Sequence, residues 1–348
     1  MVKALEGTAH NRRRGWRWLW LLLLGTSVGA PPAGAQTCQS AADMDASVET
    51  ALETTGKRYF DMSARGDTAA LQQNSIASVA ASFAGIEAAV KENQAAFNGA
   101  NAKVRPPFLL TTEGLEPLAR AEFLCGVFGK SGQTKDSAVF VLPNLPPGKY
   151  GVTILDVNGS QGARTLTFVL QQVFGDWKLA GFYARPSQAC GHDAAWFTQR
   201  ARDFKSKGQN HNAWLYYREA IALAAPVDFM STLSTDKLYD ETQATQPADV
   251  PVNGSTVEVS AGDKIEHSTW TWTEIFPLAV GDDLDVVVKY QVNDVSNTAR
   301  AFQENTRVIT ALVEKFPELR EAFAGVVARA VEPSGRDYGT LMAMKEIK

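Results

Sequence analysis

The chain has 348 residues, of which 45% are hydrophobic and 21% charged, with 34 Lys and Arg against 38 Asp and Glu. Glycine and proline occur at ordinary frequencies, which excludes collagen-like, low-complexity and wholly disordered proteins. The composition also excludes a multispanning membrane protein, and the length is sufficient for two or three domains.

The first 35 residues are typical of an export signal. Four arginines between positions 12 and 17 precede an apolar run over residues 18–24, and small residues at Ala33 and Ala35 suit a signal peptidase. We therefore expect cleavage after Ala35 and a secreted or periplasmic protein. The apolar part is shorter than the roughly 20 residues of a bilayer span. Membrane contact is expected only during export or, as the alternative, through an uncleaved signal anchor.

Cleavage would change the charge of the protein. Without residues 1–35 the chain keeps 29 basic and 37 acidic side chains, a net charge of −8. A surface of this sign repels phosphate backbones, so we expect no nucleic-acid partner.

Three cysteines in an exported chain allow one disulfide and leave one thiol. Cys125 lies in an apolar stretch typical of a buried strand, where a free cysteine behaves as a small apolar residue. Cys38 and Cys190 flank the first predicted domain, so we expect a Cys38–Cys190 disulfide. Three cysteines allow three possible pairings, and the sequence pattern does not choose among them.

Residues 38–189 predict a first α+β domain. Apolar residues at helical spacing indicate one helix over residues 42–64 and a second helical stretch over residues 68–97. The period then changes to two, which predicts an antiparallel meander with strands at 121–128, 137–142, 149–157, 164–174 and 177–184. Helices followed by strands favour helices packed on a curved antiparallel sheet.

Two segments of this domain resemble a known family. The helix end YFDMSARGD, residues 59–67, and the strand GDWKLAGFY, residues 175–183, are similar to the nuclear-transport-factor-two-like superfamily of cone-shaped domains, over residues 40–187. Members include ketosteroid-isomerase-like enzymes and binding domains, so the resemblance implies a fold rather than an activity. A site in the cone interior, with Tyr59 and Asp61 as candidates, would need convergent polar groups. An interior filled by Phe and Leu would speak against one.

Residues 190–230 predict a helical hairpin. Phe and Ala spacings over residues 194–227 resemble one tetratricopeptide repeat, in which small residues let two antiparallel helices approach closely. The resemblance implies a peptide-binding groove, for which Trp214, Tyr216 and Arg218 are the candidate residues. The alternative is a helical hairpin with a purely structural role.

The remaining residues predict a linker over 231–253 and a smaller α+β domain over 254–348. The expected order is three strands, two helices and two strands, with Pro317 starting the second helix and a turn at residues 333–335. Trp270 and Trp272 alternate on one strand face, the arrangement of a carbohydrate-stacking platform or of a core face.

Together these patterns predict an exported, non-enzymatic binding protein of the bacterial cell envelope, whose partner is another protein or an envelope component. The alternatives are an isomerase-like or small-molecule-binding protein that uses the interior of the first domain, and carbohydrate binding through Trp270 and Trp272. We expect no cofactor. His192 and His211 do not occur at the spacing of a closed metal site, so no metal site is predicted.

Overall fold

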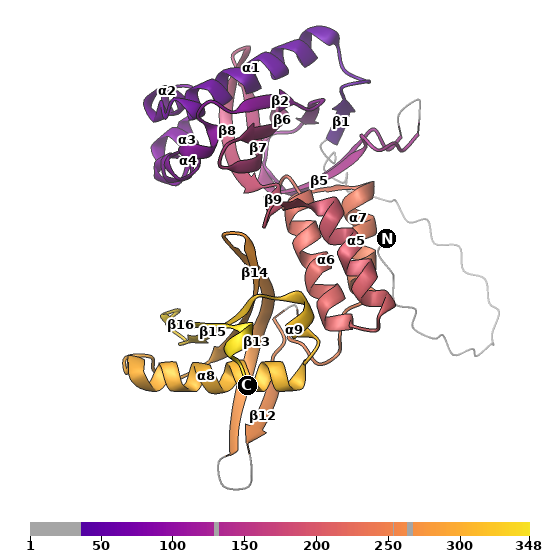
Figure 1. Cartoon of the computed structure of the whole chain (residues 1–348). Coiled ribbons are helices and arrows are strands. Elements are labelled where there is room, and N and C mark those ends of the chain that lie inside the picture. The colour runs from indigo at the N-terminus through magenta and orange to yellow at the C-terminus, as the bar shows by residue number, and fades with distance from the viewer. Residues whose placement is uncertain (1–35, 129–131, 253, 263–266) are drawn as a thin grey trace, which may run out of the picture. The chain divides into compact units, whose positions relative to one another are not determined.

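The computed structural model describes residues 36–128, 132–252, 254–262 and 267–348. The predicted export signal lies outside the described residues. The fold is α+β, as predicted, with helices packed on largely antiparallel sheets (Figure 1). Within the part of the chain that the structure describes, no helix combines the length and the apolarity needed to cross a bilayer.

A twisted sheet with helices on one face forms the first part of the fold. Its strand order is β1-β3-β6-β7-β8, with β2 paired to β6. The strands are β1 (Gln36–Ser40), β2 (Asn101–Val104), β3 (Phe108–Thr112), β6 (Gly148–Gly159), β7 (Gly162–Val173) and β8 (Asp176–Pro186). The helices are α1 (Ala46–Ala64), α2 (Thr68–Gln73), α3 (Ala77–Ala81) and α4 (Ala84–Phe97).

The single helical stretch predicted over residues 68–97 is wrong. The backbone between α2 and α3 is hydrogen-bonded to strand β8. The Leu179 carbonyl accepts from the Ile76 N–H, and the Leu179 N–H donates to the Asn74 carbonyl, both at 2.9 Å. These bonds satisfy polar groups that a continuous helix would have paired internally. The apolar positions Leu71, Phe83 and Val90 are buried as the helical spacing predicts.

A second, smaller sheet covers the other face of the first one. It has the order β11-β5-β4, formed by β4 (Leu118–Cys125), β5 (Ala138–Leu145) and β11 (Met230–Thr232). Phe108 and Phe140 meet edge to face between the two sheets, at 5.1 Å between ring centroids. The predicted single meander is therefore two sheets around a separate core.

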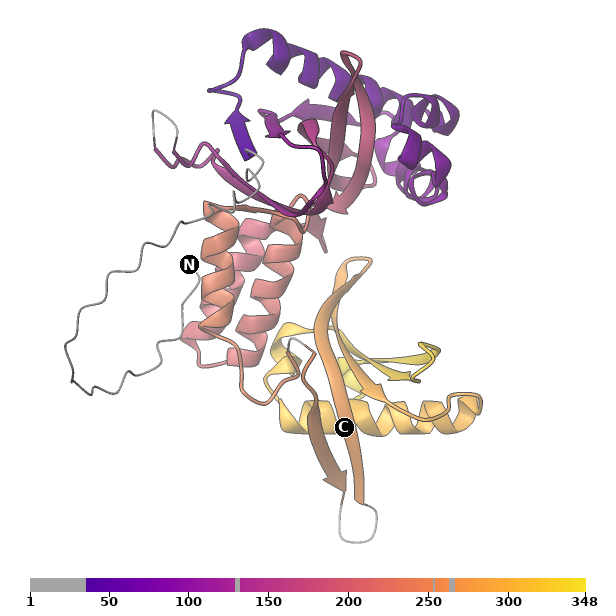
Figure 2. The same cartoon turned by 180° about the vertical axis from the view of Figure 1, so that it is seen from behind.

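Three helices follow: α5 (Ala194–Ser206), α6 (Asn210–Ala224) and α7 (Leu233–Gln243), which lie side by side in both views (Figures 1 and 2). The short strands β9 (Gln188–Ala189) and β10 (His192–Asp193) precede them. The predicted hairpin is confirmed by α5 and α6. The predicted linker over 231–253 is wrong, because Thr232 caps α7 through a reciprocal capping box with Thr235.

The C-terminal part has the element order that the sequence predicts. Strands β12 (Val257–Gly262), β13 (His267–Val280) and β14 (Asp283–Gln291) precede α8 (Thr298–Lys315) and α9 (Leu319–Ala322), and β15 (Gly325–Val331) and β16 (Asp337–Ala343) follow. A single 3₁₀ turn, Met344–Glu346, comes after β16. Strands β14 and β15 pair in parallel, because α8 crosses over between them. One apolar core runs from this sheet into the α5–α7 helices.

The disulfide joins Cys38 to Cys125, so the predicted Cys38–Cys190 pairing is wrong. Residues 36–40 form a strand that the sequence pattern did not predict, and this strand brings the Cys38 Cα within 4.9 Å of the Cys125 Cα. Cys190 is a half-buried free thiol, and burial together with nearby carboxylates, Glu219 first, raises its pKa to about 11. The disulfide fits an extracellular protein.

Candidate functional site

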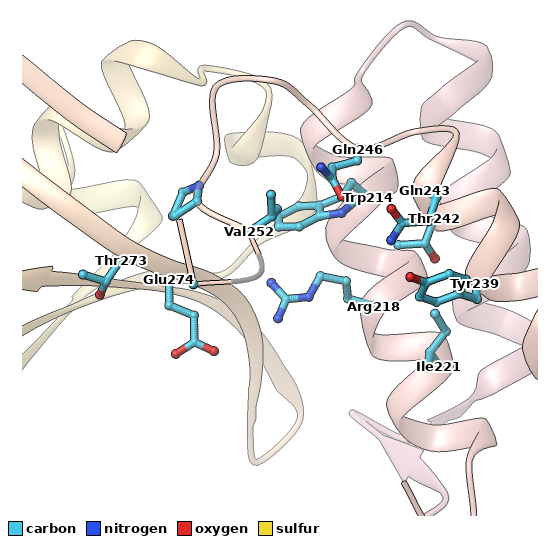
Figure 3. A pocket seen from close by; sticks show the side chains of 12 residues that line it. Trp214, Arg218, Ile221, Tyr239, Thr242, Gln243, Gln246, Val252, Thr273 and Glu274 are labelled. Carbon is cyan, nitrogen blue, oxygen red and sulfur yellow. The ribbon is translucent and has the colours of Figure 1, made fainter. Parts of the chain in front are cut away.

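A cavity of about 560 Å³ lies between the helices and the C-terminal sheet, and its size is in the range of small-ligand sites. Helices α6 and α7, residues 246–252 with Gly254, and strand β13 form its walls (Figure 3). The lining residues are Trp214, Arg218, Ile221, Tyr239, Thr242, Gln243, Gln246, Pro251, Val252, Gly254, Thr273 and Glu274. The cavity therefore combines aromatic and aliphatic surface with two amides and one guanidinium.

Arg218 is the cationic group of this cavity. Its guanidinium carbon lies 4.8 Å from the centroid of the Trp214 ring, and its Nη1 donates to the Ile275 carbonyl. That carbonyl is its single hydrogen-bond acceptor among the described residues, so most of its N–H groups have no protein partner. Burial lowers the pKa of Arg218, and Glu274 partly offsets this effect. The guanidinium is thus a partly buried cation with unused donors.

Two other polar groups of the cavity, Glu274 and Thr242, are already paired. Glu274 accepts a hydrogen bond from Lys289 at 2.8 Å. The hydroxyl of Thr242 donates to the Leu238 carbonyl at 2.7 Å, which leaves this hydroxyl no free proton for chemistry. Since the unpaired groups are donors and ring faces rather than a nucleophile beside a base, the arrangement is suited to binding.

Helix α7 forms one wall of the cavity and is fixed to α5 and α6 by hydrogen bonds to the carboxylate of Glu241. Arg202 on α5 donates two hydrogen bonds to Glu241, at 2.7 and 2.9 Å, and Tyr217 on α6 donates a third at 2.8 Å. The Arg202 bonds, followed by that of Tyr217, lower the pKa of Glu241 to about 2 against the opposing effect of burial. The wall is therefore held by an ionised carboxylate.

Replacement of Glu241 by Gln is expected to cost about 1 to 2 kcal/mol of folding free energy at pH 7, a value reduced for the partial exposure of Arg202. Because the folded-state pKa is depressed, this stabilisation is complete above about pH 4.5 and is lost as the pH falls towards 2. Urea unfolding from pH 2 to 7 should show the two proteins converging at the acid end. Asp240→Asn, an exposed change on the same helix, should track the wild type; parallel curves for Glu241→Gln would contradict the assignment.

Two of the three helical candidate residues line the cavity. Trp214 and Arg218 are four residues apart, so they lie on one face of α6. Tyr216 points to the opposite side, where it is buried among aromatic rings and donates to the Ala322 carbonyl at 2.8 Å. Its predicted place in a groove with Trp214 and Arg218 is wrong, because residues two apart on a helix do not share a face.

Trp270 and Trp272 belong to the core. They are 6% and 0% exposed, and the indole N–H of Trp270 donates to Glu304 on α8 at 2.5 Å. Trp272 packs against Phe316, with 6.2 Å between ring centroids. The carbohydrate-stacking prediction is wrong, since helix α8 and its following residue cover the rings that a sugar would need.

The interior of the first part is packed. Leu52, Tyr59, Phe97 and Phe168 are fully buried between the helices and the sheet. The Tyr59 hydroxyl donates to the carbonyls of Asn74 and Trp177, at 2.8 and 3.1 Å. The interior is thus filled by aromatic and aliphatic side chains, and this hydroxyl has a structural role.

The residues that α7 and β13 contribute to the cavity were not identified from the sequence pattern. Tyr239 and Gln243 fall within the stretch predicted as a linker, and Glu274 was not among the candidate residues. Leu238 and Thr242, four residues apart and buried, were the helical signal in that stretch.

A larger cavity of about 820 Å³ adjoins strands β2 and β3. Its Arg105 is already bound to both carboxylate oxygens of Asp156, at distances of 2.6 to 3.1 Å. It therefore lacks the unused guanidinium that marks the first cavity. The chain matched no protein-family model, curated protein or solved structure with which it was compared.

Proposed function

We propose that the protein is an exported, non-enzymatic binding protein of the bacterial cell envelope, released by cleavage after Ala35. It holds a short extended segment of another protein in the cavity between α6, α7 and β13. The observation that carries this proposal is Arg218, whose guanidinium is stacked on Trp214 and bonds to one acceptor among the described residues, which leaves most of its donors free for a partner.

The chemistry of the walls defines the segment. Arg218 favours an acidic side chain or a carboxylate, because a charged acceptor would complete its hydrogen bonds. Ile221 and Val252 favour an apolar side chain beside that acidic group. Tyr239, which is 55% exposed, offers a ring face at the rim for the segment to lie on.

The test is selection of random heptapeptides displayed on phage by the full exported protein. We expect enriched peptides that carry an acidic group next to an apolar residue. Ile221→Trp fills the cavity and should weaken their binding at least about tenfold, or about 1.4 kcal/mol, by fluorescence anisotropy. The amino terminus of the exported protein should be Gln36.

Leu341→Trp is the matched control, since Leu341 lies on β16 and is 57% exposed. It introduces the same ring away from the cavity and should leave peptide binding unchanged. Failure to enrich any peptide, or equal binding by wild type and a folded Ile221→Trp protein, would exclude the cavity as a peptide site.

A further inference from the structure

His211, at the start of α6, lies between two carboxylates. Its Nδ1 is 2.6 Å from Oε1 of Glu318, just before α9, and its Nε2 is 2.9 Å from Oδ1 of Asp249. Asp249 belongs to residues 244–252, which we call the wall segment because Gln246, Pro251 and Val252 of this segment line the cavity. One imidazole ring thus connects the helix, the C-terminal part and the cavity wall.

The two contacts of His211 require a particular protonation state. An ionised carboxylate only accepts hydrogen bonds, so both ring nitrogens must donate, and only the imidazolium carries two N–H groups. A neutral ring keeps one N–H and turns the lone pair of its other nitrogen towards a carboxylate oxygen. Because two acceptors repel, a neutral His211 can hold one carboxylate but not both.

Two side chains at the end of α8 also pack around this site. Lys315, at the end of α8, lies 3.6 Å from Oδ2 of Asp249, and the Phe316 ring centroid lies 3.9 Å from that of His211. Partial burial acts to raise the pKa of Asp249, but the hydrogen bond and charge of His211 outweigh it and hold that pKa below its usual range.

Other polar groups hold the Glu318 side of this arrangement. The Asn212 side chain donates to the Glu318 backbone carbonyl at 2.6 Å and to Oε1 of Gln209 at 3.0 Å. Lys207 and Gln209 both bind Glu321, one turn further along α9. Glu318 is thus fixed by its backbone, whereas Asp249 depends on His211 and Lys315.

We propose that His211 is a pH-sensitive clamp on the cavity wall: the imidazolium holds the wall segment through Asp249, and the neutral imidazole releases Asp249 while keeping Glu318. Asp249 is the partner released, because its contact is the longer one and its side chain is 45% exposed, against 21% for Glu318. Val250 is buried and keeps the segment attached, so release loosens the wall without detaching it.

The consequence for binding rests on the proposed function. When the wall is looser, a smaller fraction of the molecules has the cavity in its binding-competent form. The apparent affinity falls in proportion to that fraction. A partner segment therefore binds more tightly in acid than in alkali.

The clamp is tested without any ligand, by amide hydrogen exchange of the full exported protein at pH 5.5 and pH 8.0, corrected for intrinsic exchange rates. The amides of the wall segment, which its two prolines lack, should lose at least about fivefold protection at the higher pH, a typical coupling between two states. Amides of α8 should keep theirs. Equal protection of residues 244–252 at both pH values would overturn the clamp.

Glu318→Gln separates the clamp from a general effect of pH. The amide of the new side chain can donate to Nδ1 of a neutral imidazole, which leaves Nε2–H for Asp249, so both contacts survive in alkali. We expect less than about twofold change in protection in this nearly isosteric variant, against about fivefold in the wild type. A Glu318→Gln protein that follows the wild type would also overturn the clamp.

These outcomes are independent of the peptide selection. Loss of pH-dependent protection would remove the clamp and leave peptide binding untouched. Absence of any bound peptide would remove the proposed function and leave the exchange experiment valid. If both hold, a selected peptide should bind wild type about fivefold more weakly at pH 8.0, and Glu318→Gln equally at both pH values.

Discussion

Removal of the Cys38–Cys125 disulfide, by Cys38→Ser together with Cys125→Ser, is expected to lower the free energy of unfolding by about 2 to 5 kcal/mol. The two cysteines are 87 residues apart in sequence, so the bond restricts a long loop of the unfolded chain. In the folded protein it joins β1 of the first sheet to β4 of the second, and so holds the sheets around the core that contains Phe108 and Phe140.

Urea unfolding of the variant and of the reduced wild type measures this effect. Cys190→Ser is the matched control, because Cys190 is a free thiol; since the residue is half-buried, its replacement should cost about 1 kcal/mol or less. A double variant as stable as the oxidised wild type would show that the disulfide does not restrain the folded state.

The second large effect is expected at Asn305, a fully buried residue of α8. It accepts a hydrogen bond from the Tyr290 hydroxyl at 2.8 Å and donates to Thr340 Oγ1 at 2.9 Å and the Tyr338 carbonyl at 3.1 Å. Asn305→Leu removes the partner of the buried hydroxyls of Tyr290 and Thr340. Each buried polar group left unsatisfied costs about 1 to 3 kcal/mol, so we expect a loss of about 3 to 5 kcal/mol.

A double-mutant cycle in urea tests this network. Tyr290→Phe removes one of the orphaned groups, so the double variant should lose about 1 kcal/mol less than the sum of the single changes. Thr310→Val on the same helix removes only a local bond to the Thr306 carbonyl and should cost less than about 1 kcal/mol. A loss below about 1 kcal/mol for Asn305→Leu would contradict the role of the network.

The C-terminal part was predictable because its signals are local. Alternating apolar residues give way to helical spacing, and Pro317 and the turn at residues 333–335 mark the boundaries. The hairpin α5–α6 was predictable for the same reason. By contrast, β1, β2 and β3 are four or five residues long and owe their strand state to partners far away in sequence.

The candidate site was only partly predictable, because it is assembled from distant segments. Trp214 and Arg218 could be identified on one helix, but their cavity exists only when α7 and β13 are placed against that helix. The two buried tryptophans show the same limit of sequence patterns, which do not reveal which distant segment covers a surface. The alternation of Trp270 and Trp272 identifies a strand face, but only the position of α8 decides that this face is covered.

Strand β11 changes where the first part can be cut from the rest. Its three residues pair with β5, and Met230 of this strand closes the core beside Phe140 together with Val227. A fragment ending at residue 189 would present an unpaired β5 edge next to an uncovered aromatic side chain, which favours aggregation. A piece that keeps β11 also keeps α5 and α6, whose apolar core continues into the C-terminal sheet. A cut at residue 189 uncovers the first core, and a cut after Thr232 uncovers the second, so the first part is joined to the rest of the chain by two cores rather than by a linker.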